Sequence, residues 1–141
     1  MNKRQPYREY ATQAFRFLAR EGSADKYISK LVDDYMGQAR SAGISNPTEA
    51  ILMHKERMLR DNAAELADLD AAEKALLVCG RFPRMAVEMV YQWNCWDELE
   101  WGDIETRVHF AEIQIPASRK QIYFWLAKVR KEFALERGLR I

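Results

Sequence analysis

The stretch "IPASRKQIYFWLAKVRK", residues Ile115 to Lys131, contains a turn, a helix start and both faces of a helix. Ser118 is a good N-cap residue, and Gln121 occupies the position where a capping box places its side chain. The sequence therefore predicts a helix over residues 119–136, ended by Gly138. Apolar residues at i, i+3, i+4, i+7 and i+11 predict a face buried against the preceding helices. These residues are Ile122, Trp125, Leu126, Val129 and Phe133.

The other side of this helix combines cations with aromatic rings. A short helix, a turn and a longer helix with a basic start is the arrangement in which a recognition helix enters the major groove of DNA. Arg119 and Lys120 suit phosphates or guanine edges, and Gln121 suits adenine. An amphipathic terminal helix with a solvated basic face is the alternative, and the pattern leaves it open. The candidate DNA-binding residues are Arg119, Lys120, Gln121, Tyr123, Phe124, Lys128 and Lys131.

The same helix resembles a known family. The run "SRKQIYFWLAKVRKEF" is similar to the pattern S-x-x-T-[VI]-Y-x-W-L-x-x-x-R-x-x-F of ArpU-like and RinA-like phage transcriptional regulators. The matching positions are Ser118, Ile122, Tyr123, Trp125, Leu126, Arg130 and Phe133. The resemblance covers about the last 40 to 60 residues and implies a helix-turn-helix similar to region 4 of sigma factors. It also implies sequence-specific binding of double-stranded DNA, with the reading residues after Ser118.

Two positions depart from that pattern. Gln121 stands where the family has Thr, and Phe124 stands where a basic residue is common. Phe124 either touches a thymine methyl group or docks a protein partner, such as RNA polymerase or a second copy of the chain.

Composition and charge fit this hypothesis. The chain has 141 residues, 48% of them hydrophobic and 30% charged, which is typical of a folded globular chain with one core. The net charge of +1 conceals an asymmetry. Residues 1–60 carry 11 basic and 7 acidic side chains, residues 61–118 carry 4 and 12, and residues 119–141 carry 7 and 2. The C-terminal helix can therefore create a local field for a polyanion.

Gly and Pro, 6 and 4 in number, fall almost only where helices are expected to begin or end, which predicts an all-α fold. Helices are expected over residues 6–21 and 24–42, separated by Gly22 and by Ser23 as N-cap, and they should form an antiparallel hairpin. "NPTE", residues 46–49, should begin a long helix that no Gly or Pro interrupts before Gly80.

The long helix has leucines at heptad spacing that then shift frame. This leaves open a dimerising coiled coil or a helix packed on its own hairpin. The leucines are Leu52, Leu59, Leu66, Leu69 and Leu76. Its acidic residues are expected to form a solvated face: Asp61, Glu65, Asp68, Asp70 and Glu73.

The segment after Gly80 should begin a further helix at Pro83, with Met85, Ala86, Met89, Val90 and Trp93 on its apolar face. "NCWDELEWGD", residues 94–103, lacks periodicity and predicts a structured loop anchored by Trp96 and Trp101. Asp103 is expected to cap a short helix over residues 104–112. Because like charges repel, this acidic loop should lie away from bound DNA.

No catalytic or metal-binding pattern is present. Cys79 and Cys95 match no metal spacing, and no pattern orients Cys95 towards His109. The carboxylates of residues 97–105 lack the spacing of a calcium loop, and the phosphate-binding glycine motifs are missing. We expect no enzyme activity, no cofactor and no metal. With no signal-peptide pattern and no apolar run near about 18 residues, we expect a cytoplasmic protein.

Two functional hypotheses follow. In the first, residues 1–80 dimerise or recruit a partner and residues 81–141 bind duplex DNA, as in a phage or prophage regulator. In the second, the chain is a protein-interaction or assembly module of a mobile element without specific DNA binding. Its acidic middle and exposed aromatic residues would then face another protein.

Overall fold

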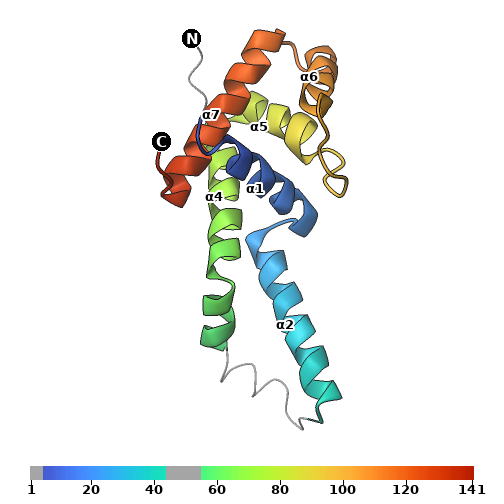
Figure 1. The fold of residues 1–141 in the computed structure, drawn as a ribbon, viewed down its shortest axis with the longest axis vertical. Helices are drawn as coiled ribbons and strands as arrows, with labels where there is room; N and C mark the ends of the chain where they lie inside the picture. Colours follow the sequence, from blue (N-terminus) through green and yellow to red (C-terminus); the bar gives the residue numbers. More distant parts are fainter. Residues whose placement is uncertain (1–4, 44–54) are drawn as a thin grey trace.

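The computed structural model describes residues 5–43 and 55–141. Over these ranges the chain is helical with connecting loops and contains no strand, which confirms the predicted all-α fold. The elements in Figure 1 are α1 (Arg8–Glu21), α2 (Ala24–Ser41), α4 (Ala63–Cys79), α5 (Arg81–Val87), the π-helix η1 (Glu88–Gln92), α6 (Asp103–Gln114) and α7 (Arg119–Arg137). Residues 55–61 are also helical. The predicted N-cap Asn46 and the residues Pro47, Glu49 and Leu52 lie outside the described residues.

The hydrophobic core lies where α7 crosses α1, α4 and α5 (Figure 1). Its largest apolar side chains, which include Phe15, Leu69, Leu126 and Phe133, are fully buried. Residues before and after Gly80 share this core. The predicted division into a partner-binding region, residues 1–80, and a DNA-binding region, residues 81–141, therefore remains a hypothesis about function. Within the described ranges, no helix is long and apolar enough to cross a membrane.

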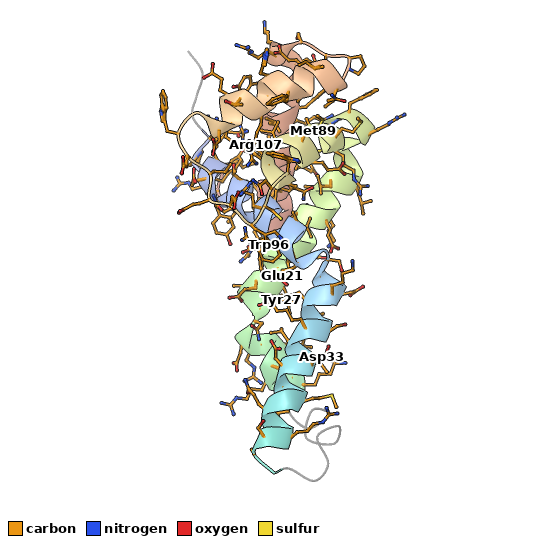
Figure 2. The ribbon with its side chains drawn as sticks, turned by 90° about the vertical axis from the view of Figure 1, so that its right-hand side faces the viewer. Glu21, Tyr27, Asp33, Met89, Trp96 and Arg107 are labelled. Carbon is orange, nitrogen blue, oxygen red and sulfur yellow. The ribbon has the colours of Figure 1, made fainter. Side chains whose placement is uncertain are left out.

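The helix α2 and the segment of residues 55–79 form a projection that we call the arm (Figure 1). Figure 1 shows α2 leaving the end of α1 and running beside residues 55–79, and Figure 2 places Tyr27 near this junction and Asp33 farther along the arm. The backbone N–H of Ala24 donates to Glu73 Oε1 at 2.7 Å, and the Tyr27 hydroxyl donates to Asn62 Oδ1 at 3.4 Å. α2 continues away from the end of α1 and runs antiparallel to residues 55–79 (Figure 1), so the antiparallel hairpin predicted for the first two helices is not formed. α1 packs instead against α4, α7 and η1.

The long helix expected to run without interruption up to Gly80 is broken at Asn62. This residue has φ −113° and ψ 21°, and its Nδ2 donates to the carbonyl of Met58 at 2.9 Å. An asparagine side chain competes with the backbone for such hydrogen bonds and can end a helix without Gly or Pro.

Two carboxylates that were expected in solvent instead connect elements. Glu73 accepts the hydrogen bond from Ala24 at the start of α2. Asp68 Oδ1 accepts from Arg137 Nε at 2.7 Å and from the Tyr10 hydroxyl at 2.5 Å, joining α4 to α7 and α1. Burial, followed by the hydrogen bond to Asp68, raises the pKa of Tyr10. Of the five acidic residues predicted to be solvated, Asp68 and Glu73 therefore bind other helices instead.

The helix after Gly80 begins at Arg81 and changes to a π-helix at Glu88. The π-helix ends at Gln92, and Trp93 follows it in an extended conformation with ψ 133°. Trp93, predicted on the apolar face of a continuing helix, is therefore outside the helix and 63% exposed, whereas Tyr91 is 1% exposed.

Candidate nucleic-acid interface

The helices α6 and α7 are joined by a tight turn at residues 115–118. Ile115 is fully buried, and the Ser118 Oγ accepts a hydrogen bond from the backbone N–H of Gln121 at 3.2 Å. Gly138 ends α7 in the left-handed conformation, with φ 76°. The predicted start and end of this helix are thus confirmed.

The start of α6 differs from the prediction. Gly102, with φ 88°, is its N-cap, and Asp103 is already its first residue. The Asp103 carboxylate accepts a hydrogen bond from the backbone N–H of Glu100 at 2.7 Å. Asp103 therefore closes the preceding loop and does not cap the helix.

The buried face of α7 determines how the helix is rotated. Ile122, Leu126, Val129 and Phe133 are all fully buried, as predicted. Arg130, 7% exposed, donates from Nη1 to the Tyr91 hydroxyl at 2.5 Å and from Nε to Gln5 Oε1 at 2.8 Å. A helix held along its whole length by these contacts presents a fixed opposite face to solvent.

That opposite face, which we call the basic stripe, consists of five of the seven predicted residues. Each is exposed, and their spacing of i, i+1, i+4, i+8 and i+11 places them on one side of α7. Phe124 is 62% exposed and lies one turn from Lys120 and from Lys128. Among the described residues, no carboxylate forms an ion pair with its lysines. The basic stripe is Lys120, Gln121, Phe124, Lys128 and Lys131.

The other two predicted residues lie to the side of the stripe. Arg119 Nε is 3.7 Å from Glu112 Oε2, so this guanidinium is directed towards α6. Tyr123 is half-buried and packs against the core, although the sequence placed it on the surface. Glu112 thereby links α6 to α7, and its carboxylate also lies 3.6 Å from Nδ1 of His109 on α6 itself.

A stack of three side chains lies beside the stripe and has no signal in the sequence pattern. Trp125, which was expected in the core, is half-buried and stacks on Phe82 with ring centres 5.9 Å apart and an interplanar angle of 13°. Arg81 Cζ lies 5.7 Å from the centre of the Phe82 ring. Trp125 is one helical turn from Gln121 and from Lys128, so this stack adds a cation next to the stripe.

Comparisons of the chain with protein-family models, with curated proteins and with solved structures gave no match. The resemblance to ArpU-like and RinA-like regulators therefore rests on the residues of α7 and stays a prediction.

Proposed function

We propose that the chain binds double-stranded DNA sequence-specifically through the basic stripe, as a transcriptional regulator of a phage or prophage. The observation that carries this proposal is the stripe itself. Its lysines have no ion-pair partner among the described residues, and they surround an exposed Phe124 on a helix whose other face is buried. Lysines without an ion-pair partner can neutralise phosphates and release the counterions of DNA, which provides a large share of the affinity of such complexes.

The positions along α7 suggest a role for each side chain. Lys120 lies in the first turn, where the backbone N–H groups lack intrahelical acceptors and favour a phosphate. Gln121 and Phe124 face the same side and suit an adenine edge and a thymine methyl group. Lys128 and Lys131 lie farther along the helix and suit phosphates. Arg119 has a supporting role, because it is directed towards Glu112 on α6.

The place of the acidic loop in the chain is compatible with this docking. It precedes α6, whereas the basic stripe begins after the turn that follows α6 (Figure 1). The 12 residues of α6 span about 18 Å between the end of the loop and the turn before α7. This exceeds the Debye length of about 8 Å at physiological salt, which supports weak repulsion between the loop and a phosphate at the Lys120 end of the stripe.

A gel shift with the DNA that flanks the gene, at physiological salt and with competitor DNA, tests the proposal. We expect a discrete band that survives the competitor and is lost with Lys120→Ala/Lys128→Ala. Phe124→Ala should weaken binding by about tenfold, or about 1.4 kcal/mol, because it removes an apolar contact with a thymine methyl group.

Phe110→Ala is the matched control for Phe124→Ala. Phe110 is a phenylalanine of similar exposure, 60% against 62%, and it lies on α6 outside the stripe. Its variant should bind as the wild type does. Weak binding of every duplex, unaffected by the stripe variants, would contradict the proposal and favour the protein-interaction alternative.

A further inference from the structure

A cavity of about 720 Å³ lies between η1, the loop of residues 93–102 and α6. Met89 and Arg107, both labelled in Figure 2, line it from the two helices. The other lining residues include Trp93, Phe110 and the acidic residues Asp97, Glu98, Glu100 and Asp103. We call this cavity the acidic pocket. Its volume is within the range of about 300–1,000 Å³ that is typical of ligand pockets.

The walls of the acidic pocket are aromatic and open. Trp93 is 63% exposed and Phe110 is 60% exposed, while Met89 is half-buried. The Arg107 guanidinium lies 5.3 Å from the centre of the Trp93 ring and donates to the carbonyls of Val90 and Trp93, at 3.1 and 2.7 Å. Arg107 therefore holds the ring in place from one side, and the wall exists before any ligand binds.

The loop is also held from behind, by arginines of α1. Arg16, 1% exposed, donates to the carbonyls of Tyr91, Asn94 and Asp97. Arg20 Nη1 donates to the carbonyl of Cys95 at 3.1 Å. Burial, and then the charges of Arg107 and Arg20, lower the pKa of Arg16. These arginines bind backbone carbonyls, so they leave the carboxylates of the loop unneutralised by direct contact.

The rim of the acidic pocket carries four carboxylates. Asp97 accepts from Asn94 Nδ2 at 2.7 Å, and Asp103 accepts from the N–H of Glu100. Within the described part of the chain, the carboxylates of Glu98 and Glu100 have no hydrogen bond or ion pair. No group of three or more His, Cys, Asp or Glu residues there is arranged to hold a metal ion. The rim thus offers charge without the geometry of a metal site.

We propose that the acidic pocket binds a lysine or arginine side chain from a basic segment of a partner protein. The alkyl stem would lie against Met89, Trp93 and Phe110, because long cationic side chains bury their stems on apolar surface. The charged head would meet Glu98 and Glu100 and the free face of Trp93, through charge-assisted hydrogen bonds and a cation–π contact. The four carboxylates outnumber Arg107, so the net charge of the lining favours a cation. The proposal is independent of DNA binding.

Fluorescence anisotropy with the labelled peptide Gly-Arg-Lys-Gly-Arg-Lys-Gly, at about 150 mM salt, tests this inference. We expect saturable binding that Glu98→Gln/Glu100→Gln weakens at least about fivefold and that Phe110→Ala weakens by a similar factor. The same peptide with Glu in place of Arg and Lys should not bind.

Two controls separate the pocket from general charge attraction. Glu56→Gln/Glu65→Gln removes two exposed carboxylates from the arm, and Phe124→Ala removes an exposed ring from the basic stripe. Both should bind the peptide as the wild type does. The proposal is overturned if binding does not saturate, if the arm variant loses as much affinity as the pocket variant, or if Phe110→Ala has no effect.

Discussion

The basic stripe on α7 and the acidic pocket between η1, the loop and α6 both present exposed aromatic side chains, with similar exposure and opposite charge. Phe124 is 62% exposed among lysines, whereas Trp93 and Phe110 are 63% and 60% exposed among carboxylates. The stripe is held by its own helix, because the opposite face of α7 is buried. The pocket is held by arginines from α1 and α6 that bind loop carbonyls. One surface is organised by local periodicity and the other by contacts between distant residues.

The largest expected effect on stability comes from the arginine of α1 that holds the loop of the pocket. Arg16→Ala removes the donor to three carbonyls and leaves them without this partner. The free energy of unfolding, measured by urea denaturation, should fall by roughly 3–5 kcal/mol. Arg8→Ala, an exposed arginine of the same helix, should cost less than about 0.5 kcal/mol.

This variant also tests whether the two surfaces are held independently. Under conditions in which the Arg16→Ala variant is still folded, it should lose peptide binding and keep DNA binding. Equal loss of both would show that the loop and α7 form a single cooperative unit.

A second effect concerns the support of the stripe. Leu126 is fully buried on α7, and Leu126→Ala should cost roughly 3 kcal/mol through lost burial and a cavity. Leu135, on the same helix and 51% exposed, is the matched control, and its alanine variant should change the free energy by less than about 0.5 kcal/mol. Similar values for both leucines would contradict the assigned rotation of α7.

The sequence predicted those features that depend on neighbours in the same helix. The end of α1 at Gly22, the cap at Ser118 and four of the five predicted core positions of α7, all except Trp125, follow from helical spacing and capping preferences. The basic stripe follows from the same pattern, because a helix that buries one face must expose the other.

The features that depend on distant partners were not predicted. The position of Arg16 in the helical pattern is the same whether its side chain is solvated or buried against carbonyls 75 to 81 residues away. The loop was expected to be anchored by its tryptophans, but Trp96 is 76% exposed and Trp101 is fully exposed. The broken helix at Asn62 and the π-turn at Glu88 likewise depend on hydrogen bonds that hydrophobic spacing does not record.

The smallest of these effects concerns one backbone conformation in the loop. Asn94 has φ 53°, and its side chain donates to Asp97 Oδ2. Asn94→Ala and Asn94→Gly both lose that hydrogen bond, but only Gly adopts positive φ without cost. The alanine variant should therefore be less stable than the glycine variant by about 1 kcal/mol. Equal stability of the two variants would mean that the loop relaxes away from this conformation.

The salt dependence of DNA binding is the most direct measurement of whether the basic stripe contacts phosphates. The slope of log K against log salt should become shallower by about one for Lys120→Ala and by about one for Lys128→Ala. Lys55→Ala, an exposed lysine of the arm, should leave the slope unchanged. A slope that is the same for the wild type and for both stripe variants would remove the stripe from the interface and contradict the account.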